Sequence, residues 1–79
     1  MDKKLKNEAE TKAQIIMNYY QSKNYDLAIA NAKKLLKKFP NYVFLFNIIG
    51  LSLQAKKNLM KQLIILIKLY KLIQIILLH

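Results

Sequence analysis

Apolar residues recur at helical spacing in three successive segments, and turn-forming residues separate each segment from the next. The clearest is 25–38, where lysines occupy one face and apolar residues the other. Asn24 is expected to cap its start through its side-chain oxygen, and Pro40 is expected to end it. Small residues in its stripe should let a neighbouring helix approach closely; the stripe is Ala28, Ile29, Ala32, Leu35, Leu36 and Phe39.

Two further helices are predicted on either side of this central one, after a polar lead-in at 1–8. The first covers 9–22 and its predicted buried stripe is Ile15, Ile16 and Tyr19. The third covers 42–55, with Asn41 as its cap and a stripe consisting of Phe46, Ile49, Gly50 and Leu53. Residues 22–24 and 56–58 are expected to form the turns.

Residues 59–79 differ from the rest, because thirteen of these twenty-one residues are Leu or Ile. The segment is too long for one strand, so a fourth helix is expected, with a narrow polar stripe that includes Lys61, Lys68 and Lys71. We expect it to dock on Phe46, Ile49 and Leu53. The predicted fold class is therefore all-α, built of antiparallel helix hairpins with three to four helices.

The order of residues from 19 to 41 resembles the tetratricopeptide repeat, a helix–turn–helix unit of about 34 residues. The resemblance rests on three short runs and extends over 9–58, with 9–42 as one repeat and 43–58 as the first helix of a second. It implies an α–α superhelix. The runs are Tyr19-Tyr20, Asn24-Tyr25-Asp26 with Ala28-Ile29, and Phe39-Pro40-Asn41; the residues expected to pack as the repeat signature are Tyr19, Ala28, Leu35, Pro40, Phe46 and Gly50.

The resemblance also implies a function in protein–protein interaction, because first helices of successive repeats line a groove that holds a peptide or protein. At least three repeats are usually needed for stability, so one and a half repeats indicate a fragment or truncated remnant of a longer repeat protein. Carried over position by position, the candidate groove residues are Met17, Tyr20, Gln21, Asn47, Leu51 and Gln54. The alternative for Met17 and Tyr20 is packing against the next repeat.

The genetic code offers an explanation for the unusual tail. Met60 has the single codon ATG and Lys61 begins AA, so a reading frame shifted onto the third base of Met60 must encode Glu. The following shifted triplets can encode Ala and Ile, and those at Ile73 and Gln74 can encode Pro and Asn. These fall about 34 codons after their counterparts in the first repeat. The sequence therefore indicates a frameshift near Asn58.

The positive charge of the chain suggests two other kinds of partner, nucleic acid and a membrane surface. The chain carries a net charge of +10, yet all fourteen basic residues are lysines, and the Arg fork that dominates base and phosphate recognition is absent. Nucleic acid is therefore an unlikely partner. The alternative function is binding to a membrane surface through the cationic, apolar residues 59–79. The exposed apolar face would also favour self-association.

Candidate chemistry is sparse. The one His is the terminal His79, no acids are spaced for metal binding or paired-carboxylate catalysis, and the absence of Cys excludes disulfides and thiolate ligands. We therefore expect neither enzymatic activity nor a metal or cofactor. A further alternative is the repeat region of a transferase whose catalytic domain is absent. The charged N-terminal residues resemble no signal peptide, which favours a cytoplasmic location.

Overall fold

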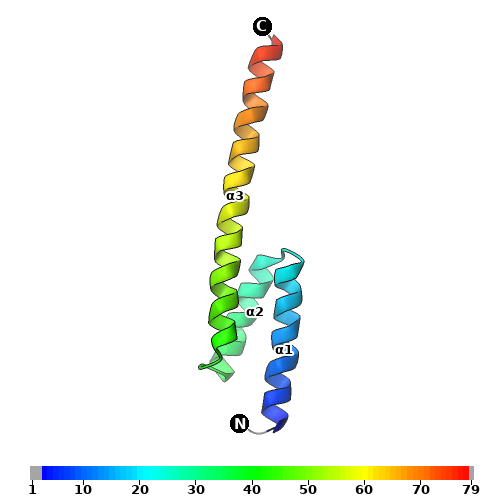
Figure 1. Ribbon diagram of the computed structural model, residues 1–79, viewed down its shortest axis with the longest axis vertical. Coiled ribbons are helices and arrows are strands. Elements are labelled where there is room, and N and C mark those ends of the chain that lie inside the picture. Colours follow the sequence, from blue (N-terminus) through cyan, green and yellow to red (C-terminus); the bar gives the residue numbers. More distant parts are fainter. Residues whose placement is uncertain (1–2, 79) are drawn as a thin grey trace.

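The computed structural model describes residues 3–78 as three helices joined by two short turns (Figure 1). α1 spans Lys3–Gln21, α2 spans Tyr25–Lys38 and α3 spans Val43–Leu78. α1 and α2 form an antiparallel hairpin, against which the first part of α3 packs, mainly on α2. The rest of α3 extends alone past the hairpin, so the molecule measures 70 × 17 × 13 Å. The predicted all-α class is confirmed for the described residues. The terminal His79, for which the sequence predicts no enzymatic role, lies outside them.

α2 has the bounds and the buried face that the sequence predicts. Its apolar stripe faces α1 and α3, and Ala28 and Ala32 are fully buried there. Phe39 follows the helix with a non-helical backbone, and its N–H still donates to the Leu35 carbonyl at 2.9 Å. Pro40 therefore ends α2 as expected, because a residue before proline is driven out of the helical region.

The turn between α1 and α2 is built by the backbone. Lys23 takes a left-handed conformation with φ 65°, and its N–H donates to the Tyr20 carbonyl at 3.0 Å. The next N–H, from Asn24, donates to Tyr19 at 2.8 Å, which completes a Schellman motif. The predicted side-chain cap is wrong: Asn24 occupies the cap position without a side-chain cap hydrogen bond, and its carbonyl accepts from Ala28 N–H instead.

The polar lead-in is helical from Lys3 and continuous with the helix expected from Ala9, because residues 3–8 contain no Gly or Pro to separate the two. Its buried positions are Ala9, Ala13 and Ile16, spaced by four and three residues. The predicted stripe is partly wrong, since Ile15 is exposed and Tyr19 is half-buried. Two of these three buried residues of α1 are alanines, and their small side chains let α1 lie close to its neighbours.

The buried face of α3 differs from the predicted one by rotation about the helix axis. Leu45, Ile48 and Ser52 are buried, whereas Phe46 and Leu53 are 57% and 53% exposed. Residues 42–53 are apolar nearly all round, so periodicity does not select a face and packing on α2 decides it. The predicted cap is also wrong, because Tyr42, not Asn41, directly precedes α3.

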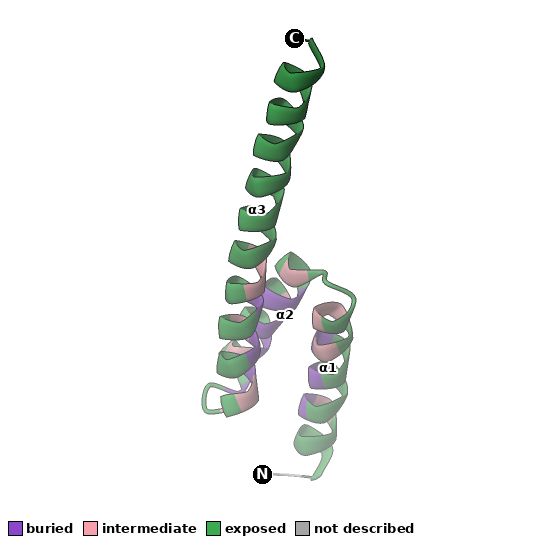
Figure 2. Cartoon of the chain, turned by 45° about the horizontal axis from the view of Figure 1, so that its top comes forward, coloured by how far each residue is buried: buried purple, intermediate pink, exposed green. Residues whose placement is uncertain are grey.

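The predicted turn at 56–58 and the separate fourth helix are wrong. α3 continues through Lys56, Lys57 and Asn58 without a break, because none of these residues prevents intrahelical hydrogen bonding. Consequently no helix within residues 3–78 folds back to dock on Phe46, Ile49 and Leu53. Every residue from 57 to 78 is exposed, as Figure 2 shows by the uniform colour of that half of α3.

Candidate protein-binding surface

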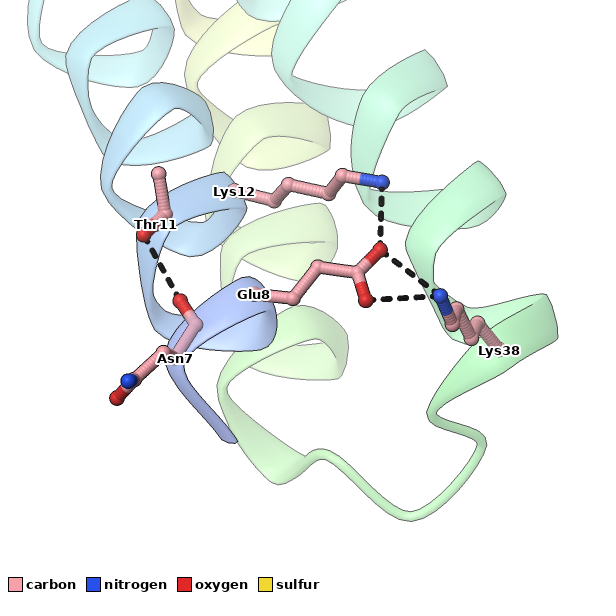
Figure 3. Close-up of polar contacts among 5 residues, drawn as sticks. All are labelled: Asn7, Glu8, Thr11, Lys12 and Lys38. Carbon is pink, nitrogen blue, oxygen red and sulfur yellow. Dashed lines mark hydrogen bonds and ion pairs between the residues drawn. The ribbon is translucent and has the colours of Figure 1, made fainter. Parts of the chain in front are cut away.

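The charged side chains near the N-terminus of α1 hold the hairpin at its open end. Both carboxylate oxygens of Glu8 accept from Lys38 Nζ at 2.8 Å, and one also accepts from Lys12 Nζ at 3.1 Å (Figure 3). The hydrogen bond from Lys38, followed by the one from Lys12, lowers the pKa of Glu8. Beside this cluster the Thr11 hydroxyl donates to the Asn7 carbonyl. The cluster therefore fixes α1 against the end of α2.

A second ion pair fixes α3 against the start of α2. Lys56 Nζ lies 2.5 Å from the Asp26 carboxylate, although both side chains remain substantially exposed. Exposed pairs of this kind contribute on the order of 0–1 kcal/mol. The pair also marks the last point at which α3 touches the hairpin through a charged contact among the described residues.

The six predicted groove residues come from α1 and α3. Met17 and Tyr20 of α1 are half-buried and pack against the core, and the Tyr20 ring meets Tyr25 edge-on at 5.7 Å between centroids. The other four side chains are exposed, and the three on α3 follow each other at four- and three-residue spacing on one face: Gln21, Asn47, Leu51 and Gln54. The tyrosine contact thus belongs to the α1–α2 turn, while the α3 residues remain available to a partner.

The six predicted signature residues divide into two groups. Ala28 and Leu35 are buried in the core and Tyr19 is half-buried, as their signature role requires. Pro40 is exposed in the turn after α2, the helix that it was expected to end. Phe46 and Gly50 lie uncovered on α3; a Cβ added to Gly50 would meet no atom within 4 Å. No helix crosses Gly50 within the described part of the chain.

Two concave regions are formed by residues outside the predicted groove. The larger, about 740 Å³, lies at the open end of the hairpin. It combines Phe39, Tyr42 and Val43 with the charged Lys6, Glu10 and Lys38. The smaller, about 360 Å³, lies between α1 and α2 beside Lys12 and Ile15. The sequence analysis did not predict either region. The aromatic residues at 39–44, among which the Tyr42 and Phe44 ring centroids lie 5.8 Å apart with the rings tilted at 47°, were the available signal for the larger one.

The described residues offer no metal centre, because no group of three or more acidic, His or Cys side chains converges within 3–78. Over the same range, none of the helices combines the length and apolar character needed to cross a membrane. The remaining feature of note is therefore the apolar surface of α3. It carries exposed Leu, Ile, Val and Phe side chains from residue 43 to residue 78.

Comparison of the chain with protein-family models, with curated proteins and with solved structures gave no match.

Proposed function

We propose that residues 9–58 are one and a half tetratricopeptide-type repeats and act in protein–protein interaction. The observation that carries this proposal is the order of packing: an antiparallel α1–α2 hairpin followed by α3, which packs on α2 and runs in the same direction as α1. The interval between Ala9 in α1 and Val43 at the start of α3 matches the repeat length of about 34 residues. Repeats stack so that each covers its neighbour.

The uncovered face of α3 supports the view that a further helix once followed. Phe46, Gly50 and Leu53 lie there, and Gly50 would let a neighbouring helix approach without a side chain in the way. In a helix without a neighbour on that side, glycine brings no packing advantage and destabilises the helix by about 1 kcal/mol relative to Ala. The chain on this account is a truncated remnant of a longer array.

A frameshift near Asn58 explains how that helix was lost. The continuous helix through 56–58 and the exposed tail beyond it are what a chance sequence of Leu, Ile and Lys codons would give. The nucleotide sequence tests this proposal. A shifted frame that stays open and encodes Glu-Ala-Ile, and later Pro-Asn, supports it. A stop codon in that frame, or Thr in place of the Ala, counts against it.

The proposed binding surface combines Met17, Tyr20 and Gln21 of α1 with the exposed α3 residues Asn47, Leu51 and Gln54. Tyr and Leu offer large contact area, and the amides can fix an extended peptide by hydrogen bonds. We assign this surface no catalytic role and no cofactor. The identity of the partner, and whether the parent array preceded a transferase domain, are questions for the coding sequence downstream.

Selection of random displayed peptides on the purified full chain tests the binding proposal. We expect ligands whose capture falls at least tenfold in a Leu51→Ala, Gln54→Ala variant. The matched control is Lys33→Ala, Lys34→Ala, which truncates two exposed side chains on the outer face of α2 and should leave capture unchanged. Equal losses in the two variants, or no enrichment, would contradict the assignment.

Binding to an anionic membrane surface is the second candidate function. The exposure of every residue from 57 to 78 favours it, as do the lysines among them. Flotation with vesicles containing phosphatidylserine is the test. The candidate requires binding that weakens with salt and disappears when residues 59–79 are deleted. Indifference of the full chain to these vesicles removes it.

A further inference from the structure

The face of α3 that packs on the hairpin does not stop where the hairpin stops. Leu45, Ile48 and Ser52 are buried on it, and Ala55 is half-buried one turn further on. Three- and four-residue steps continue this face along the tail, where every residue from 57 to 78 is exposed (Figure 2). The six positions that continue it, here called the tail seam, are Leu59, Leu63, Leu66, Tyr70, Ile73 and Leu77.

No lysine lies on the tail seam. Lys61, Lys68 and Lys71 each lie two residues from a seam position, which is about 200° around an α-helix. With Lys57 they form a narrow charged stripe on the opposite side of α3. Apolar residues at positions a and d of a heptad, with charge directed away, are the pattern of helices that pack on one another.

We propose that the tail seam is the docking surface for a second copy of this chain, whose α3 packs on it in antiparallel orientation. The seam is symmetric about residue 68, so antiparallel alignment pairs Leu59 with Leu77, Leu63 with Ile73, and Leu66 with Tyr70. This orientation also places the two cationic hairpins at opposite ends, which lowers the repulsion between chains of net charge +10. The overlap from Leu59 to Leu77 covers nineteen residues and is about 28 Å long.

A second copy suits this surface better than a lipid bilayer does. A helix that lies in a membrane interface has a broad polar face, whereas the tail is polar only along its lysine stripe. In the antiparallel pair both stripes point away from the seam and stay in water. The flanking side chains, such as Ile65 and Leu69, remain apolar, so pairs are expected to associate further into a bundle. This inference concerns the chain as it stands and does not depend on the repeat assignment.

Sedimentation of the full chain without lipid, compared with two lysine variants, tests the seam. Leu66→Lys introduces a charge on it, and Ile64→Lys introduces the same charge on the lysine stripe; the two side chains are 60% and 50% exposed in one copy. We expect the unsubstituted chain and Ile64→Lys to associate, and Leu66→Lys to associate at least about tenfold more weakly. A monomeric unsubstituted chain overturns the proposal, even if it binds vesicles, and so does equal weakening by both variants.

Disulfide trapping tests the orientation and does not depend on how a variant affects stability. The chain has no Cys, so single cysteines report without background. A mixture of Leu63→Cys and Ile73→Cys chains should form the mixed disulfide several times faster than either chain forms a disulfide with itself. Preferential self-coupling of Leu63→Cys would indicate parallel packing and overturn the antiparallel pair.

Discussion

Glu8 in α1 and Lys38, the last residue of α2, lie thirty residues apart in sequence and are joined by two 2.8 Å hydrogen bonds. This contact closes the open end of the hairpin, opposite the turn at Lys23. It also determines how the hairpin should respond to acid, because protonation of Glu8 removes the acceptor charge.

We expect Glu8 to make the hairpin sensitive to mild acid. Hydrogen bonding to Lys38, and then to Lys12, lowers the pKa of Glu8 below its ordinary value of 4.5. The unfolded chain thus binds the Glu8 proton more tightly than the folded chain does. The contribution of Glu8 to the free energy of unfolding is therefore complete above pH 4.5 and is lost as the pH falls through the lowered pKa of the folded chain. NMR titration of the Glu8 carboxyl group should show the lowered pKa directly.

A matched pair of variants isolates this contact. Glu8→Gln should lower the thermal midpoint at neutral pH and flatten its decline towards acid. Glu10→Gln removes the same charge from the same helix, and the Glu10 carboxylate has no ion-pair partner among residues 3–78. An identical pH profile for both variants would show that Lys38 does not act on Glu8.

Substitution of the buried Ser52 should raise the stability of the core. Its hydroxyl is fully buried and has no hydrogen-bond partner within the described residues. Ser52→Ala keeps the volume nearly unchanged and removes a desolvated polar group, so the free energy of unfolding should rise by about 1 kcal/mol. Urea unfolding measures this. Ser22→Ala is the control, because its hydroxyl donates to the Asn18 and Tyr19 carbonyls and its removal should bring no gain.

Lys23 is the residue at which glycine should be the better choice. A left-handed conformation costs a non-glycine residue about 1–2 kcal/mol, offset in part by the greater freedom of glycine in the unfolded chain. Lys23→Gly should therefore stabilise the hairpin by up to about 1 kcal/mol. Lys33→Gly, the same change in the middle of α2, should destabilise it by about 1 kcal/mol. Effects of the same sign in thermal unfolding would rule out the proposed turn.

Gly50→Ala should stabilise α3 in this chain. The position is helical and open, so an added Cβ meets no neighbour and the helix gains about 1 kcal/mol of propensity. The gain should disappear once a further helix covers that face of α3. Loss of stability in the chain as it stands would mean that another segment already occupies the space.

The sequence predicts the part of the fold that is bounded by strong local signals. α2 has lysines on one face and two alanines in its stripe, which indicate its buried side, and the proline after it sets its C-terminal end. The buried face of α3 cannot be predicted in this way, because Leu45 and Phe46 are equally suitable for burial and only the position of α2 selects between them. The turn expected at 56–58 was inferred from repeat length, and no residue there opposes a helix.

The candidate binding surface can also be predicted only in part from the sequence. Met17 and Tyr20 are constrained by the core and by Tyr25, a contact between helices that periodicity does not reveal. Asn47 and Gln54 are exposed because they lie off the predicted stripe of α3 and also off the observed one. Tail positions such as Leu66 share a face with Ile48 only because α3 is continuous, and the sequence alone suggested a break.

We propose that α3 presents its exposed Phe46, Gly50 and Leu53 to the second helix of a following repeat. The urea unfolding free energy of a chimera in which residues 59–79 are replaced by a second copy of residues 25–41 tests this contact. The control chimera carries Lys at both added positions that copy Ala28 and Ala32. The account predicts that the first chimera is more stable than the control by at least about 2 kcal/mol. Equal unfolding free energies would contradict it, because the added helix would then lie in solvent.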